Sequence, residues 1–288
     1  MGASALLLAG CARVEPTSPT ASSTPLLSPS PGADGVGVAV EATATGTLLG
    51  ALLVGAVAKL GTVASAQPAP ADVVSALQNR AVVTAPVWAS TIWAQLSDDE
   101  ELPEDVVTEL AGLLPPEVNV LSPGLVDGGL VWMASAASGM KSLEDLSEWS
   151  KGKSAAVPAM AIERSDGMGA LNAIYRTNFQ ALTLDDPVAR AAAVASGQAG
   201  IGVFRRTEYL GGAALVELID PDQMCVSDQL VLLVNAAYAD ASPQQVLALN
   251  AVVQGLNTEQ VVALSGQVAQ GAPVADVAHG WLASHQLA

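Results

Sequence analysis

The chain contains 288 residues, of which 51% are apolar, so it can bury a sizeable core either as one large domain or as two lobes. Lysine and arginine total 11 against 28 aspartate and glutamate residues, which gives a formal net charge of −17. Because a chain this acidic offers no basic patch to neutralise phosphates, we exclude nucleic acid as a partner.

The N-terminus is apolar and ends in Leu-Ala-Gly-Cys at residues 8–11. This tetrapeptide resembles the lipobox of bacterial lipoproteins, in which the cysteine is acylated and becomes the new N-terminus. We therefore predict that residues 1–11 are the remnant of a lipoprotein signal and that Cys11 carries a lipid anchor. The apolar run is short for a signal core and no Lys or Arg precedes it, so we expect the natural start to lie upstream. The alternative is a chance cysteine after an apolar end.

Residues 12–34 are rich in proline, serine, threonine and alanine. Such a segment cannot bury apolar area, so we predict a disordered tether that holds the folded part away from the membrane. The predicted location is the extracytoplasmic face of the cell membrane. Cys225, the only other cysteine, is interpreted as a small buried hydrophobic residue, with a reactive thiol as the alternative.

Residues 42–58 carry no charge and place several leucines on one helical face. They predict the first helix of the fold, at about residues 47–60, with a membrane-spanning helix as the alternative. β-type runs flank this helix at residues 36–40 and 62–66. The alternation of strand and helix predicts an α/β fold with mostly parallel strands.

Further elements follow along the chain. Asp72 is placed to cap a short helix, and residues 81–84 predict a strand that ends in a loop at Pro86. Residues 142–145 form a capping-box pattern that opens a helix through Trp149. A further helix is expected to open at Ser242, and two final helices follow at residues 258–269 and 273–286.

The strongly apolar runs at residues 130–133 and 230–234 bracket a middle section with its own helices and strands. We interpret them as two crossover strands between two lobes. The corresponding boundaries are residues 35–131 together with 235–288 for lobe 1 and residues 132–234 for lobe 2.

The sequence offers few residues or motifs that could catalyse a reaction. His279 and His285 lie six residues apart in a predicted helix, so they point largely to different sides and make a poor metal pair. The sequence contains no glycine-rich phosphate loop, no nucleophile-elbow serine and no Cys/His metal spacing. A catalytic pair of carboxylates is not excluded by a sequence with 28 aspartate and glutamate residues. The acidic run at residues 98–101 is nevertheless interpreted most simply as a solvated loop. We predict no enzymatic activity, no metal and no cofactor.

Four segments carry a family resemblance. They are Ala-Leu at 76–77 followed by Pro-Val-Trp-Ala-Ser-Thr at 86–91, Leu-Glu-Asp-Leu at 143–146, Arg-Ser-Asp-Gly at 164–167 with Leu171, Tyr175 and Phe179 behind it, and the closing segments at 255–282. In order and spacing the chain resembles the substrate-binding proteins of ABC importers for glycine betaine, choline, carnitine and related quaternary ammonium osmoprotectants. The resemblance extends from about residue 36 to the C-terminus. It implies a two-lobed type II periplasmic-binding-protein fold, in the α/β class, with two crossover strands.

The resemblance also implies a site. A trimethylammonium group has no hydrogen to donate and is best held against aromatic faces, whereas a carboxylate favours arginine and a helix N-terminus. By position Trp88 replaces a cage tyrosine, Thr91 adds a hydroxyl and Arg164 faces a carboxylate. The remaining predicted solute contacts are Thr45, Phe204, Thr207 and Glu208.

Each of these interpretations has a structural alternative. Trp88 can simply fill a lobe core, Arg164 can pair with Asp166 or a surface acid, and Glu208 can be a charge on the lobe surface. The chain also departs from the family pattern, since only 3% of its residues are aromatic and Arg205-Arg206 brings two cations to a loop near the expected solute. Either the cage is partial, or the solute is smaller, differently charged or held by polar contacts.

The predicted function is that of an extracytoplasmic, monomeric solute-binding protein. Its lobes close by a hinge over a small osmolyte, which is then passed to the permease of an ABC importer. The alternative is a surface lipoprotein with the same fold that binds another small solute or serves as a non-transport scaffold.

Overall fold

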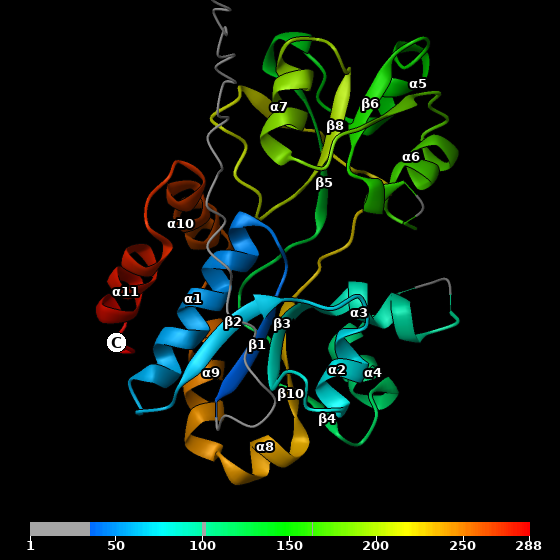
Figure 1. Cartoon of the computed structure of the whole chain (residues 1–288). Coiled ribbons are helices and arrows are strands. Elements are labelled where there is room, and N and C mark those ends of the chain that lie inside the picture. Colours follow the sequence, from blue (N-terminus) through cyan, green and yellow to red (C-terminus); the bar gives the residue numbers. More distant parts are fainter. Residues whose placement is uncertain (1–34, 100–101, 163) are drawn as a thin grey trace, which may run out of the picture. The chain divides into compact units, whose positions relative to one another are not determined.

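The computed structural model describes residues 35–99, 102–162 and 164–288 (Figure 1). The predicted signal remnant, the lipid site at Cys11 and the tether at 12–34 lie outside these residues. The described chain forms two five-stranded sheets flanked by helices, so the predicted α/β class is confirmed.

The first sheet has the strand order β2-β1-β3-β10-β4. Strand β1 pairs in parallel with β2 and β3, whereas β10 runs antiparallel to β3 and β4. The strands are β1 (Val36–Val40), β2 (Ala64–Pro68), β3 (Thr84–Trp88), β4 (Val118–Val120) and β10 (Leu230–Asn235).

Side chains of adjacent strand residues point to opposite faces of a sheet. Because strands β1, β3 and β10 of the first sheet are apolar on both faces, helices cover both faces. Val38 joins the core formed with α1, α9, α10 and α11, while its neighbour Ala39 joins the core formed with α2, α3 and α4. The helices are α1 (Ala44–Ala58), α2 (Val73–Gln78), α3 (Ala89–Leu96), α4 (Val106–Leu113), α8 (Ala236–Ala241), α9 (Pro243–Gly255), α10 (Thr258–Ala269) and α11 (Val274–Ser284).

The second sheet has the order β7-β6-β8-β5-β9, with α5 and α6 against one core and α7 against another. Its strands are β5 (Leu130–Ser135), β6 (Ser154–Val157), β7 (Gln180–Thr183), β8 (Ile201–Arg205) and β9 (Leu215–Glu217). Its helices are α5 (Leu146–Trp149), α6 (Met168–Ile174) and α7 (Pro187–Ala195), with 3-10 turns η1 (Ala136–Ser138), η2 (Leu143–Asp145) and η3 (Ala159–Ala161).

The chain crosses between the sheets twice, at residues 121–129 and 218–229. These two crossing segments meet in an antiparallel bridge between Asp127 and Gln229. The predicted crossover strands themselves each belong to one sheet: β5 to the second and β10 to the first. The crossings precede these strands, and the lobe boundaries remain a prediction. Residues 230–234, assigned to lobe 2 by those boundaries, pair within the first sheet.

Several local predictions are confirmed. Strand β1 has the predicted bounds, Asp72 caps α2, and Ser142 with Asp145 forms a capping box before α5. No helix among the described residues is long and apolar enough to cross a membrane. Helix α1 instead buries its leucines in the core of the first sheet.

Other local predictions are wrong. Pro86 lies inside β3 and not in a loop, because the pairing with β1 involves only Thr84 and does not need the N–H that proline lacks. By contrast, the prediction of mostly parallel strands is confirmed, because in each sheet a single strand, β10 or β5, runs against the direction of the others. The helix expected to open at Ser242 is present as α9, although the Ser242 side chain makes no capping hydrogen bond.

Candidate functional site

Helix α3 begins directly after β3 with no side-chain cap of its own, since Trp88 has no acceptor to offer. Asp228, from the second crossing segment, supplies the missing acceptor. One of its carboxylate oxygens accepts from the amide of Ser90 at 2.9 Å and the other from the Thr91 hydroxyl at 3.2 Å. A carboxylate is stabilised at a helix N-terminus, which explains how Asp228 is held with only 1% of its surface exposed.

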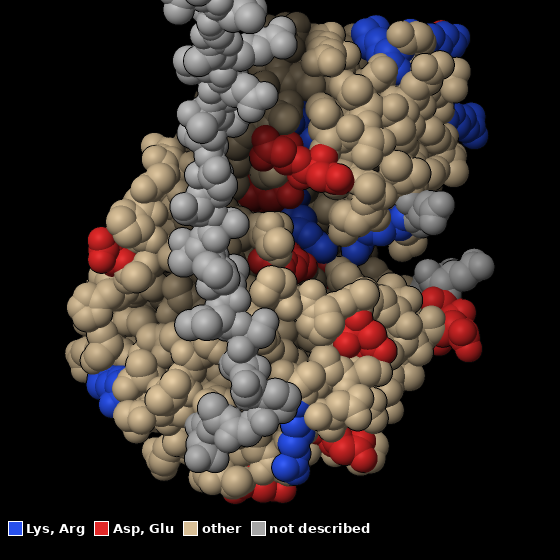
Figure 2. All heavy atoms as spheres, viewed as in Figure 1, with Lys and Arg blue, Asp and Glu red and all other residues tan. Residues whose placement is uncertain are grey.

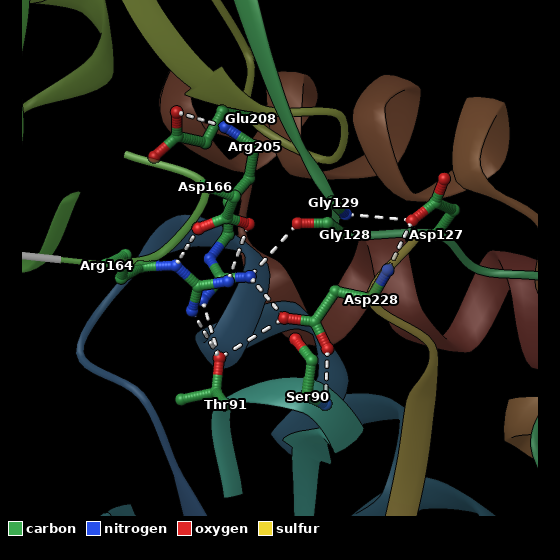
Figure 3. Close-up of polar contacts among 10 residues, drawn as sticks. All are labelled: Ser90, Thr91, Asp127, Gly128, Gly129, Arg164, Asp166, Arg205, Glu208 and Asp228. Carbon is green, nitrogen blue, oxygen red and sulfur yellow. Dashed lines mark hydrogen bonds and ion pairs between the residues drawn. The ribbon is translucent and has the colours of Figure 1, made fainter. Parts of the chain in front are cut away.

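Arg205 ends strand β8 of the second sheet and reaches this carboxylate (Figure 3). Its Nη1 lies 3.2 Å from Asp228 Oδ2 and donates to the carbonyl of Gly128 at 3.0 Å. Its Nη2 donates to the Thr91 hydroxyl at 3.2 Å. The guanidinium carbon also lies 5.1 Å from the centre of the Trp88 ring, within the range of a cation–π interaction.

Arg164 lies in the loop before α6 and forms a bidentate pair with Asp166, with N···O distances of 2.7 and 2.9 Å. Its Nη1 donates to the Thr91 hydroxyl at 3.1 Å. Burial lowers the pKa of the Arg164 guanidinium, but the hydrogen bonds and charge of Asp166 and the charge of Asp228 raise it, and the net pKa lies above its ordinary value. Arg164 is therefore a permanent cation.

Thr91 is the residue that these contacts share. Its hydroxyl donates to Asp228 and accepts from Arg164 and Arg205 (Figure 3). A hydroxyl has one proton to donate and two lone pairs, so the capacity of Thr91 is used completely. Residues of α3, the second sheet and the second crossing segment are thereby joined at one oxygen.

Trp88 is 4% exposed and its ring is closely packed. A Cβ atom added to Gly128 would lie only 2.3 Å from Trp88 Cζ3, so the first crossing segment approaches the ring as only glycine allows. The cavity beside the ring has a volume of about 10 Å³ and is lined by Glu41, Thr45, Gly46, Leu49, Pro86, Trp88 and Leu230. That volume holds about one water molecule.

The first crossing segment positions Asp228 through a hydrogen bond to its backbone amide. Asp127 Oδ1 accepts from the amides of Gly129 at 2.8 Å and Asp228 at 2.9 Å. Arg206 lies 3.5 Å from the other Asp127 oxygen, and it also pairs with Glu217. The two crossing segments thus fix the backbone from which the Asp228 carboxylate projects.

A second connection joins α1 to the loop after β8. The Thr45 hydroxyl donates to the carbonyl of Thr207 at 3.4 Å and accepts from the hydroxyl of Ser265 at 3.3 Å. All three residues are buried. Thr45 also lines the small cavity beside Trp88, so this connection borders that cavity.

Phe204 and Glu208 are held within the second sheet by Arg190, which is completely buried. The Arg190 guanidinium lies 5.2 Å from the Phe204 ring centre and pairs with Glu208 at 2.5 Å. Glu208 also accepts from the backbone amide of Arg205 at 3.1 Å. Glu208 therefore shapes the end of β8, and contact of either residue with a solute stays a prediction.

The acidic and basic side chains adjoin one another in the middle of the face in Figure 2, whereas most of the surrounding surface is neither. Two larger hollows do not include Trp88. One of about 420 Å³ is lined by Phe204, Arg205 and Glu208, and one of about 460 Å³ borders Trp132 of β5 and Asp220 and Cys225 of the second crossing segment. Burial and the charge of Asp220 raise the pKa of the Cys225 thiol, which keeps it protonated. Within residues 35–99, 102–162 and 164–288 no cluster of His, Cys, Asp or Glu is arranged to hold a metal ion.

The structure brings together Trp88, Thr91 and Arg164 in one network, and Thr45 with Thr207 in a second contact. Asp228, which completes the first network, is not among the predicted site residues, and neither is Arg205. The adjacent arginines at the end of an apolar strand were the signal for Arg205. No local pattern marks Asp228, because its role depends on a helix far away in the sequence.

Two mixed sheets, joined by two crossing segments and by a polar network where they meet, define a two-lobed α/β binding protein. The chain belongs to the family of the substrate-binding domain of ABC-type glycine betaine transport systems, whose model matches residues 34–284. The predicted family and the substrate-binding function are confirmed.

Solved structures with the same fold include a crystal structure described as a glycine betaine/carnitine/choline ABC transporter, with a TM-score of 0.73 and 13% identity over 88% of this chain and 99% of that chain. Ligand-free YehZ from Escherichia coli matches with a TM-score of 0.67 and 19% identity, covering 89% and 100% of the two chains. Lactococcal OpuAC in its closed form with glycine betaine matches with a TM-score of 0.63 and 14% identity, covering 88% of this chain and 96% of that chain. No match is found among curated proteins.

Proposed function

We propose that this chain binds a small osmolyte of the glycine betaine, choline or carnitine type and delivers it to the permease of an ABC importer. The observation that carries the proposal is the contact of the Trp88 ring with the cation Arg205, which shares the Thr91 hydroxyl with a second cation, Arg164. An aromatic face suits a quaternary ammonium group, and arginine N–H groups suit a carboxylate. The printed ligand of the lactococcal relative, glycine betaine, carries both groups.

Binding requires the network to open, because the cavity of about 10 Å³ beside Trp88 is far smaller than an osmolyte. Small-molecule sites have volumes of roughly 300 Å³ or more. The two crossing segments at 121–129 and 218–229 are the natural hinge, since few residues have to change their backbone angles there. A solute enters when the contacts of Thr91 with the second sheet are broken, and it replaces them when the sheets close.

We also propose that Cys11 carries a lipid and that the folded part functions as a monomer at the extracytoplasmic face of the membrane. The support is the Leu-Ala-Gly-Cys sequence followed by a segment rich in proline and serine. Anchoring beside a permease keeps the local concentration of a receptor high. Labelling cells with a fatty acid and comparing the full chain with its Cys11→Ala variant tests the anchor, and equal labelling of the two contradicts it.

Calorimetric titration of the purified chain with glycine betaine, choline, carnitine and proline betaine tests the solute. Glycine is the matched control, because it has the carboxylate but lacks the methyl groups that prefer an aromatic face. We expect saturable binding of at least one member of the panel and none of glycine. Silence across the panel together with binding of another metabolite removes the osmolyte assignment.

A non-transport scaffold with the same fold is the competing function. Its site can stay filled by its own side chains, as the site here is filled by Arg205 and Thr91. The receptor is favoured because the family match spans residues 34–284 and because the groups that fill the site are ones that a zwitterionic solute can replace. A chain that binds no small solute at all would support the scaffold.

A further inference from the structure

Arg205 occupies the position over Trp88 that an aromatic site offers to a ligand cation. Its guanidinium carbon lies 5.1 Å from the ring centre, and its side chain is 12% exposed. Gly128 lies against the six-membered part of the same ring, where even an added Cβ would collide. With about 10 Å³ of space beside the ring, a solute cation reaches Trp88 only if Arg205 moves.

Moving Arg205 separates a buried ion pair. Asp228 is 1% exposed and has Arg205 as its only ion-pair partner among the described residues. Removing one partner of a buried pair leaves the other charge uncompensated, which is strongly unfavourable. A solute that displaces Arg205 must therefore supply a new partner for the arginine as well as for Asp228.

We propose that Arg205 is a specificity-determining residue, a resident cation that admits solutes carrying both a cation and a carboxylate and discriminates against cations without one. The inference rests on the proposed function and names the solute class within it. A zwitterion replaces both halves of the pair: its ammonium group takes the place beside Trp88 and Asp228, and its carboxylate accepts from Arg205.

Arg164 can share the carboxylate. Two of its donors are held by Asp166 and a third by Thr91, which leaves two of the five N–H groups of a guanidinium without a partner in the described chain. Choline offers a hydroxyl in place of a carboxylate. It can take the position beside Trp88, but it leaves the charge of Arg205 unpaired.

Calorimetry with glycine betaine and choline tests the proposal on three proteins: the wild-type chain, Arg205→Met and the control Arg176→Met. In the wild type we expect choline to bind roughly 100-fold more weakly than glycine betaine, because one buried charge stays unpaired. In Arg205→Met choline should gain at least about tenfold while glycine betaine weakens, because the competing cation and the carboxylate partner are both gone. Arg176→Met should retain the wild-type preference, because Arg176 is exposed in the loop after α6 and its side chain does not belong to the network.

Equal affinities of the wild type for the two solutes, or an unchanged preference in Arg205→Met, would overturn the proposal. Because Asp228 loses its partner in that variant, the double variant Arg205→Met with Asp228→Asn repeats the test without an unpaired buried charge.

A measurement without solute separates this proposal from the proposed function. Acrylamide quenching of Trp88 is obtained as the difference between each protein and its Trp88→Phe counterpart. We expect stronger quenching in Arg205→Met than in the wild type, and equal quenching shows that Arg205 does not cover the ring. If none of the proteins binds any of the four solutes of the panel, the proposed function fails, and the quenching difference alone decides whether Arg205 is the resident cation.

Discussion

Arg164 illustrates how one side chain can combine a structural role with the binding role that we propose for it. Its bidentate pair with Asp166 fixes the guanidinium plane, and the hydrogen bond to Thr91 directs one edge toward the Trp88 network. For Arg164→Ala we expect glycine betaine to bind roughly 10- to 100-fold more weakly, since hydrogen bonds to a charged group contribute about 1.5–3 kcal/mol. Choline, which has no carboxylate, should change by less than about threefold, a difference well under 1 kcal/mol.

Lys141→Ala is the matched control for Arg164→Ala, because Lys141 is an exposed cation whose side chain makes no contact with the network. Calorimetry on both variants gives the comparison. Equal losses for glycine betaine and choline would contradict a carboxylate-binding role and point to a general disturbance of the site.

Arg190 is the residue for which burial has the largest expected effect on stability. It is 0% exposed, donates to the carbonyls of Val203, Leu184 and Asp185, and pairs with Glu208. Arg190→Met removes the guanidinium donor from those carbonyls and leaves the Glu208 carboxylate without its cation, with only the amide of Arg205 as a donor, so we expect the free energy of unfolding to fall by about 3–5 kcal/mol. Urea denaturation measures it.

The control for Arg190→Met is Arg206→Met. The Arg206 side chain is 39% exposed, and an exposed pair contributes at most about 1 kcal/mol. If the two variants lost the same stability, the Arg190 cluster would not be the anchor of β8 that its contacts indicate.

At the scale of elements, the sequence predicts the helices and strands that depend on local patterns and misses those that depend on distant partners. Asp72 and the capping box at 142–145 are local signals, and both are present as predicted. Strand β3 continues through Pro86 because β10 pairs with it from Thr84 to Trp88, and no local pattern reports that partner. Asp228 is missed for the same reason, since the helix that it caps is 138 residues away.

The first crossing segment depends on Gly128 for its approach to Trp88. Gly128→Ala places a Cβ 2.3 Å from Trp88 Cζ3, and the ring or the segment has to move. We expect the free energy of unfolding to fall by about 1–3 kcal/mol, which is typical of overpacking, and the affinity for glycine betaine to fall with it. Denaturation and calorimetry measure the two effects.

Gly280→Ala is the matched control for Gly128→Ala. Gly280 lies in α11 with no atom within 4 Å of an added Cβ, so alanine should stabilise the helix by about 0.5–1 kcal/mol. If the Gly128→Ala protein were as stable as the wild type and bound glycine betaine equally well, the predicted collision between the added Cβ and the Trp88 ring would be contradicted.

At the scale of the whole molecule, the sequence correctly predicts the fold family from motifs that are spread over most of the chain, whereas the solute contacts that it places near the ends of β3 and β8 stay a prediction. It does not predict that the site is filled by Arg205, because that depends on how closely the two sheets approach. The prediction of mostly parallel strands is confirmed, but helix and strand alternation does not reveal that β5 and β10, the strands that follow the two crossings, run against the other strands of their sheets.

The approach of the two sheets depends on the hydroxyl of Thr91, which joins α3 to Arg164 and Arg205. Thr91→Val keeps the shape of the side chain and removes both acceptor bonds, each of which contributes about 1.5–3 kcal/mol because the donor is charged. A loss of even one such bond shifts an open–closed equilibrium roughly tenfold or more toward the open form, since 1.4 kcal/mol corresponds to a factor of ten. We expect small-angle scattering of the solute-free variant to give a larger radius of gyration than that of the wild type.

Thr183→Val is the control for Thr91→Val, because Thr183 is exposed on β7 and its radius of gyration should match that of the wild type. Saturation with glycine betaine should return Thr91→Val toward the wild-type value, because a bound zwitterion supplies the contacts between the sheets that the hydroxyl had made. A solute-free Thr91→Val protein that scatters like the wild type would mean that the remaining contacts, those of Arg205 with Trp88 and Asp228 and that of Thr45 with Thr207, are enough to hold the sheets together. In that case the Thr91 hydroxyl would not control the hinge.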